Sequence, residues 1–349
     1  MNDNITPYVR YIGADDKDLD LFESQYVVPQ GISYNSYVIT DEKIAVMDTI
    51  DQRKTEEWTV RLEEALEGRT PDYLIVQHME PDHAANIGWF AEKYPEATIV
   101  ASAKAIQMMP QFFEEVNFAG RTQTVKEGDT LCLGQHTLKF IMAPMVHWPE
   151  VMLTYEESEK ILFSADAFGK FGALCHEGEW IDEARRYYFN IVGKYGAQVQ
   201  ALLKKAAGLD IAMICPLHGP VLKENLGYYI GLYDTWSKYE PETEGVVVAY
   251  ASIHGNTAAA ARRMAEILSE KGAAEVMLID LCRDDMALAV ESAFRYSKMI
   301  VAASSYDAGV FPPMFDFLHH LQIKNFQKRR VGIIENGSWA PTAGRMMSC

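Results

Sequence analysis

The stretch QHMEPDH, Gln77–His83, decides the fold of this chain. It follows YLIV, Tyr73–Val76, a short run of apolar β-branched and aromatic residues that predicts a buried strand. Alternate residues of an extended segment face the same side, so the side chains of the motif can converge at the strand end. Burying two imidazoles and two carboxylates without a cation is costly, and a bound metal supplies the missing charge. The motif therefore predicts metal binding by His78, Glu80, Asp82 and His83.

Three further apolar, strand-like runs lead into a histidine or an aspartate. LKFIMAP comes shortly before His147, ILFSA precedes Asp166, and IAMICPL precedes His218. Open sheets place their sites at strand ends, so these residues are expected to meet the central motif at one rim. Asp48, at the end of IAVMDT, fits either a ligand or a loop-closing carboxylate.

Seven candidate ligands exceed the four of a closed structural zinc site and suit two metal ions. The expected division gives one ion His78, Glu80 and His147, the other Asp82, His83 and His218, and places Asp166 between them as a bridge. Each ion then has two imidazoles and one carboxylate, a donor set that leaves open positions on ferrous iron. Iron is the expected metal, with manganese or zinc as alternatives. The histidines without such a setting are expected on the surface: His136, His176, His319 and His320.

Composition bounds the class of protein. With 349 residues, 48% hydrophobic and 23% charged, the chain is expected to be a globular protein of two domains. Its formal net charge of −17 argues against nucleic acid and anionic membranes as partners. No apolar run reaches the roughly 18 residues of a spanning helix, and the start MNDNITPYVR does not resemble a signal peptide. Reduced core thiols in a cytoplasmic protein are expected because no CxxC pair occurs among Cys132, Cys175, Cys215, Cys282 and Cys349.

A second patterned region follows YEPETEG, Tyr239–Gly245, a polar stretch with a proline that predicts a linker. The apolar run VVVAYAS then leads through the loop SIHGNT into an alanine-rich segment with helical pattern. A strand, a loop of small polar residues and a helix N-terminus together form an anion site. The predicted domains are therefore residues 1–240 and 245–349, with a phosphate site at the start of the second.

The metal-binding residues carry a resemblance to known families. HxExDH followed by His147, Asp166 and His218 resembles the metallo-β-lactamase fold, whose hydrolytic members have a second histidine where this chain has Glu80. The glutamate, with YNSYVI, HWPE and DAFG, resembles the flavodiiron proteins, or A-type flavoproteins, over nearly the entire chain. The resemblance implies an α/β protein: an αββα sandwich with a di-iron centre, then a flavodoxin-like, doubly wound parallel sheet. The family histidine matching His83 ligates iron in some members and swings away in others.

SIHGNT resembles the FMN-phosphate loop of flavodoxins, and two later loops resemble the family's isoalloxazine loops. The phosphate residues implied are Ser252, His254, Gly255, Asn256 and Thr257, and the ring residues are Ser305, Tyr306, Asp307, Ala308, Asn336, Gly337, Ser338, Trp339 and Ala340. Tyr306 or Trp339 either stacks on the flavin or simply packs. Flavodoxin-like domains normally continue with another helix, strand and helix, so the second domain is expected to be truncated or abbreviated, with an exposed sheet edge.

The resemblance implies an enzyme. FMN would take electrons from a separate small redox protein, typically rubredoxin, and pass them to a di-iron site that reduces O2 to water, NO to N2O, or both. A head-to-tail homodimer, with the flavin of one subunit beside the irons of the other, is also implied. Two other classes remain open: a dizinc hydrolase with an appended flavodoxin-like domain, and an electron carrier with FMN and no metal. Glu80 and the FMN loop count against the hydrolase.

Overall fold

The central motif follows a middle strand of a six-stranded sheet. This strand, β8 (Tyr73–Val76), pairs in parallel with β7 and β9, so the carboxyl ends of the three strands share one rim. The structure is a computed structural model that describes residues 4–176 and 178–348. The sheet order is β1-β6-β7-β8-β9-β10. Its other strands are β1 (Val9–Tyr11), β6 (Tyr37–Thr40), β7 (Ile44–Met47), β9 (Thr98–Ser102) and β10 (Thr122–Val125).

A five-stranded sheet packs against the first. Its strands, in spatial order, are β11 (Thr130–Cys132), β12 (Thr137–Met142), β13 (Met152–Glu156), β14 (Ile161–Phe163) and β15 (Met213–Cys215). Ile75 and Val100 of the first sheet share one buried cluster with Phe140 and Phe163 of the second. Two short ribbons complete the β-structure: β2 (Ala14–Asp16) with β5 (Ile32–Tyr34), and β3 (Leu21–Phe22) with β4 (Tyr26–Val27).

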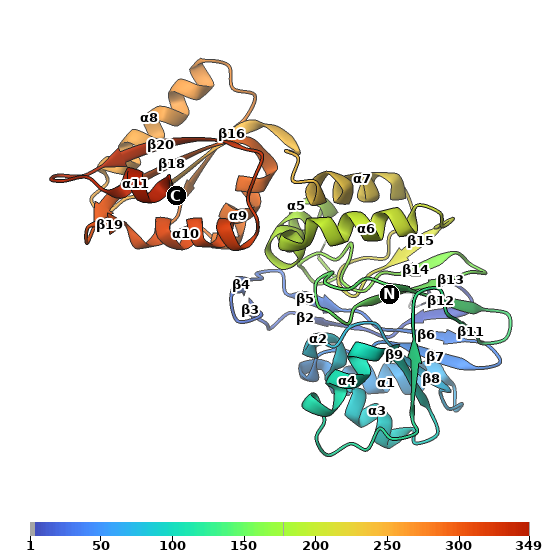
Figure 1. The fold of residues 1–349 in the computed structure, drawn as a ribbon. Helices are drawn as coiled ribbons and strands as arrows, with labels where there is room; N and C mark the ends of the chain where they lie inside the picture. The colour runs from blue at the N-terminus through green and yellow to red at the C-terminus, as the bar shows by residue number, and fades with distance from the viewer. Residues whose placement is uncertain (1–3, 177, 349) are drawn as a thin grey trace. The chain divides into compact units, whose positions relative to one another are not determined.

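Helices cover the outer faces of both sheets, which gives four layers (Figure 1). On the first sheet lie α1 (Thr55–Leu66), α3 (Ile87–Lys93) and α4 (Ala103–Phe112), while α2 (Pro81–Ala84) lies at its rim. α1 buries Trp58 and Leu62, one turn apart, as its apolar spacing predicts. On the second sheet, Lys205 of α6 (Gly196–Ala206) donates to the carbonyl of Met142, 2.7 Å away. The predicted αββα sandwich is confirmed.

A parallel sheet organises the C-terminal part of the chain. The strand order is β17-β16-β18-β20, and all three pairings are parallel, whereas β19 turns back antiparallel on β18. The strands are β16 (Thr243–Ala251), β17 (Val276–Asp280), β18 (Tyr296–Tyr306), β19 (Gly309–Val310) and β20 (Arg330–Asn336). The first strand begins inside the stretch predicted as a linker, because Thr243 already pairs with Tyr296.

Helices lie on both faces of this sheet. α8 (Asn256–Glu270) covers one face, and α9 (Met286–Arg295) and α10 (Pro312–Ile323) cover the other, with the short α11 (Ala343–Met347) near β20 (Figure 1). The predicted doubly wound, flavodoxin-like sheet is therefore confirmed. None of the helices within the described ranges combines the length and apolar composition that a membrane crossing requires.

The contacts divide the described chain into two units, of which the second takes residues 185–197 and everything from residue 231. The inserted segment includes the end of α5 (Trp180–Tyr187), the π-helical turn η2 (Tyr188–Val192) and the 3₁₀ turn η3 (Gly193–Tyr195). Arg185 anchors it, because its guanidinium bonds Glu242 and lies 2.8 Å from Glu291. The 3₁₀ turn η1 (Gln52–Lys54) precedes α1. The helix α7 (Leu226–Ser237) crosses the boundary between the two units, at residues 230–231.

Two expectations about single residues are wrong. His136 is buried rather than exposed, because its ring and its backbone N–H both bond the carboxylate of Asp41, at 2.7 and 2.8 Å. Cys132 and Cys175 are exposed rather than in the core. They, Cys215 and Cys282 are free thiols, as predicted, while Cys349 lies outside the described residues.

Candidate metal centre and flavin pocket

Four of the predicted ligands converge at the rim where β8 ends. Nε2 of His78 lies 3.2 Å from Oε2 of Glu80 and 3.3 Å from Oδ2 of Asp166. Nε2 of His147 lies 3.1 Å from each of the same two oxygens. Two imidazole nitrogens and two carboxylate oxygens therefore face one point, and we call these four residues the first ligand group.

The other three predicted ligands form a second ligand group. Oδ2 of Asp82 lies 3.3 Å from Nε2 of His83 and 3.2 Å from Nε2 of His218. Those two imidazole nitrogens face each other at 3.1 Å. The remaining oxygen of Asp166, Oδ1, lies 3.0 Å from Nε2 of His83. The carboxylate of Asp166 thus presents one oxygen to each group, the arrangement that a bridge between two metal ions needs.

The donors of both groups fit a pair of cations. Within the described chain, both oxygens of Asp82 and Oδ1 of Asp166 are buried without a hydrogen-bond partner. An unpaired buried carboxylate oxygen is costly, and a cation removes the cost. Imidazole and carboxylate are also the donors that iron, manganese and zinc accept.

The pKa values of three residues in the two ligand groups are shifted by burial and by contacts with one another. Burial opposes ionisation of Asp166, but the imidazoles of His83 and His78 outweigh it and hold the pKa of this carboxyl well below its usual range. At Asp82 burial prevails and raises the carboxyl pKa to about 7. At His147 burial is outweighed by the bond to Asp166, and the pKa rises to about 9. Burial and the neighbouring imidazoles thus drive the pKa values of these two carboxyls in opposite directions.

Short segments at strand ends hold the ligands. Pro81 occupies the first turn of α2, and the backbone of Glu80 precedes it in an extended conformation, which separates the side chains of Glu80 and His83. Ala165 and Phe168, on either side of Asp166, have φ of 49° and 65°, a left-handed conformation that is strained for residues with a β-carbon. Such strain concentrates where function fixes the backbone.

Further side chains orient the ligands. The Nδ1 of His78 lies 2.8 Å from Oε1 of Glu150, and the Nδ1 of His218 lies 2.7 Å from the carbonyl oxygen of Ser33. Asp48 accepts from the backbone and side-chain N–H groups of Gln77, at 2.7 and 2.9 Å. Asp48 thus closes the loop, one of its two expected roles. Glu150 is absent from the sequence-based set, because the only local signal is its place three residues after a histidine.

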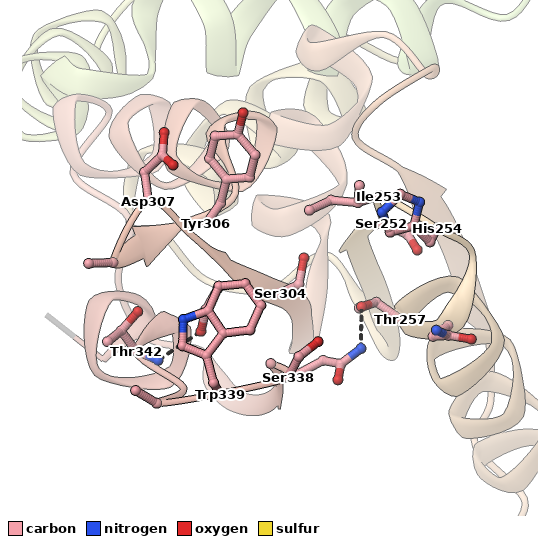
Figure 2. Close-up of a pocket in the computed structure, with 16 residues that line it drawn as sticks. Ser252, Ile253, His254, Thr257, Ser304, Tyr306, Asp307, Ser338, Trp339 and Thr342 are labelled. Atoms are coloured by element: carbon pink, nitrogen blue, oxygen red, sulfur yellow. Dashed lines mark hydrogen bonds between the residues drawn. The ribbon is translucent and has the colours of Figure 1, made fainter.

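A second site lies at the carboxyl ends of β16, β18 and β20, in a cavity of about 480 Å³ (Figure 2). Thirteen of the predicted FMN residues line it: Ser252, His254, Asn256, Thr257, Ser305, Tyr306, Asp307, Ala308, Asn336, Gly337, Ser338, Trp339 and Ala340. Gly255 does not line it, but the left-handed φ of 88° at this position starts α8. The cavity lies between the ends of neighbouring strands, where doubly wound sheets bind their ligands.

The pocket also contains residues outside the sequence-based set, namely Ile253, Ser304 and Thr342. Ser304 and Thr342 lie next to a predicted loop, so extending each loop by a few residues would have found them. The hydroxyl oxygen of Ser304 is buried without a hydrogen-bond partner within the described chain, so it favours a ligand with polar atoms. Asn336 donates to the hydroxyl of Thr257 at 3.1 Å and joins the phosphate loop to a ring loop (Figure 2). The residues therefore fit a flavin mononucleotide.

Comparison with known proteins now bears on these two sites. A family model described as "ODP family beta lactamase" matches residues 32–219. An anaerobic nitric oxide reductase flavorubredoxin of Aliivibrio salmonicida is 30% identical over 354 residues, covering 97% of this chain and 70% of the relative. The chain belongs to the flavodiiron protein family. A putative diflavin flavoprotein of Synechocystis is 32% identical over 80% of this chain and 49% of its own length.

Solved flavodiiron structures share the whole architecture. The flavodiiron protein of Giardia intestinalis superposes with a TM-score of 0.91 at 26% identity, covering 98% of this chain and 85% of that one. Rubredoxin:oxygen oxidoreductase of Desulfovibrio gigas superposes with a TM-score of 0.92 at 25% identity, covering 99% and 88%. The similarity therefore extends over both the unit with the ligand groups and the unit with the pocket.

Proposed function

We propose that this flavodiiron protein is an oxidoreductase that passes electrons from FMN to a di-iron centre and reduces O2 to water, NO to N2O, or both. The observation that carries the proposal is the pair of ligand groups joined by Asp166, in a chain that also has a flavin-type pocket. We propose His78, Glu80, Asp82, His83, His147, Asp166 and His218 as the iron ligands. Four electrons and four protons convert O2 to two waters, and two of each convert two NO to N2O and water.

The residues of the site have separable tasks. When bound, an iron pair supplies electrons at open coordination positions. Asp166 holds the two positions at a fixed separation, one oxygen for each. Glu80 and His147 are the most exposed members of the first group, with side-chain exposures of 14% and 9%, so we expect small gases to approach along them. The ring of Phe22 packs edge-on against that of His218, with the centroids 5.5 Å apart, so an apolar ring contacts the second ligand group.

We propose FMN in the pocket at the ends of β16, β18 and β20, with its phosphate on the loop from Ser252 to Thr257. The start of α8 supplies backbone N–H groups and a favourable helix dipole. The hydroxyl of Ser252 accepts from the backbone N–H of Gly255 at 3.1 Å and so shapes the loop. We propose a metal domain at residues 1–240 and a flavin domain at 245–349, although residues 185–197 and 231–240 pack in the second unit.

The electron donor proposed is a rubredoxin-like protein or domain. Relatives support it, because one is named a flavorubredoxin and another a rubredoxin:oxygen oxidoreductase. A head-to-tail homodimer is proposed from the family resemblance. A cytoplasmic location is proposed because Cys132, Cys175, Cys215 and Cys282 are free thiols, as in a reducing compartment.

An anaerobic stopped-flow experiment tests the function. The protein is reconstituted with Fe(II) and FMN, reduced, and mixed separately with O2 and with NO, while flavin absorbance and N2O are recorded. Reoxidation of the flavin with consumption of either gas supports the proposal. Zinc in place of iron, with hydrolysis of esters or amides and no gas consumption, would establish the dizinc hydrolase instead. Bound FMN with no metal would leave only an electron carrier.

A further inference from the structure

The two ligand groups are matched in the residues that face the centre. Each has two imidazoles and one carboxylate of its own, and each receives one oxygen of Asp166. Two metal ions bound there would see the same donor types and the same formal charge. The groups that lie behind the ligands can therefore make the two positions unequal.

The groups behind the imidazoles differ sharply. In the first group, Nδ1 of His78 faces the carboxylate of Glu150 at 2.8 Å, and neither side chain is exposed to solvent. In the second group, Nδ1 of His218 faces a neutral carbonyl at 2.7 Å. Nδ1 of His83 is buried and has no hydrogen-bond partner within residues 4–176 and 178–348. Among these three Nδ1 atoms, the one in the first group thus faces a buried carboxylate, and the two in the second group face a neutral carbonyl and no partner.

Glu150 is held firmly in this place. Its Oε1 accepts from the backbone N–H of Met79 at 2.9 Å as well as facing His78. Its backbone carbonyl accepts from the hydroxyl of Ser102 at 2.7 Å, and the same hydroxyl oxygen caps α4 by accepting from Ala105. The carboxylate is therefore positioned by the first sheet and by a helix start rather than by the metal. It would act on the site before any ion binds.

We infer that Glu150 makes the two metal positions unequal, so that the position of the first ligand group binds its ion more tightly and retains Fe(III) at a lower potential. The inference rests on the proposed function, since it requires a metal pair. A carboxylate on the outer nitrogen fixes the proton on Nδ1, leaves Nε2 free for the metal and strengthens it as a donor. Its negative charge also favours the ion of higher charge, and burial keeps water from screening it.

The redox consequence involves one electron. In a half-oxidised protein, the ferrous ion at the first group gives its electron to the mediator dye of the titration, and the ion at the second group stays ferrous. The dye gains that electron, and no bond is made or broken. Glu150 is a positioning residue in this account, because it touches a ligand and neither the metal nor the substrate.

Glu150→Gln and Glu150→Asp separate charge from shape. Glutamine keeps the length and an acceptor oxygen but removes the charge, whereas aspartate keeps the charge and shortens the reach. Glu156→Gln is the matched control, because Glu156 is also a fully buried glutamate but its carboxylate accepts from the backbone N–H groups of Ser158 and Glu159 instead of facing an imidazole. All variants are compared at pH 8.

Anaerobic Fe(II) titration of the FMN-loaded apoprotein and a mediated redox titration followed by EPR supply the readouts. In Glu150→Gln the tighter Fe(II) step should weaken by about ten- to a hundredfold while the weaker step stays unchanged. The first one-electron midpoint should rise by about 59 mV for each tenfold by which Fe(III) binding weakens more than Fe(II) binding, and the mixed-valence signal should shrink. Glu150→Asp should fall between wild type and Glu150→Gln, and Glu156→Gln should leave the gap between the two steps intact.

The inference is overturned if Glu150→Gln moves both steps equally, if it moves only the weaker step, or if Glu156→Gln closes the gap to the same extent. Circular dichroism of each variant shows whether it is folded. If the glutamine variant does not fold, Glu150→Asp is compared with wild type instead. A failure of the proposed function would give a different result from a failure of this inference. A wild-type protein that binds no iron pair would refute that function before any variant is made.

Discussion

Removing the hydroxyl of Ser304 should stabilise the apoprotein and destabilise its complex with FMN. The substitution is Ser304→Ala. In the apoprotein this hydroxyl oxygen is buried without a partner within the described chain, and such a group costs about 1–3 kcal/mol. Its loss should therefore raise the free energy of unfolding by about 1 kcal/mol. In the FMN complex we expect the same hydroxyl to bond the ligand, and losing that bond should cost about 1 kcal/mol. The sum, about 2 kcal/mol, is roughly thirtyfold in Kd.

Urea denaturation of the apoprotein and quenching of FMN fluorescence measure the two effects separately. Ser338→Ala is the control, because Ser338 lines the same pocket but is exposed, so its hydroxyl bonds water in the apoprotein (Figure 2). That control should change apoprotein stability little. Equal effects of both variants on the apoprotein, or a Ser304→Ala protein that is less stable yet binds FMN normally, would refute this account of the pocket.

Three further changes probe the metal unit, the β-sandwich and the second unit. Asp166→Asn should abolish tight binding of the second Fe(II), because one carboxylate serves both groups, and calorimetry should then show a single binding step. Hydrogen bonds from His136 outweigh burial and lower the pKa of Asp41, so its stabilisation is present above the ordinary pKa and lost as pH falls. Asp41→Asn should thus lower the melting temperature at pH 7, and the difference from wild type should shrink towards pH 3. Arg185→Ala leaves the buried carboxylate of Glu291 without its cationic partner and should lower the free energy of unfolding, measured by urea denaturation, by about 3–5 kcal/mol.

The convergence of the proposed metal ligands could be predicted from the sequence because each follows an apolar run. His78, Asp166 and His218 follow strands whose carboxyl ends share a rim, so local pattern and general sheet rules were enough to bring them together. The proposed phosphate loop could also be predicted from the sequence, since a strand, small polar residues and a helix follow one another directly. In both cases the information lies within a few consecutive residues.

Long-range contacts were beyond sequence reasoning. Glu150 meets His78 across 72 positions, and nothing near either residue indicates the other. His136 is buried because of Asp41, 95 positions away. Arg185 lies in a segment with ordinary helical pattern, yet its carboxylate partners are 57 and 106 positions further along the chain. Each of these depends on packing between elements, which periodicity does not encode.

Mössbauer spectroscopy of anaerobically reconstituted, ⁵⁷Fe-loaded protein tests the central claim most directly. If Asp166 joins two ligand groups as its oxygens indicate, the oxidised protein should contain two irons per chain that are magnetically coupled through a shared bridge. Magnetically isolated irons, or a single iron per chain at saturating metal, would contradict the account.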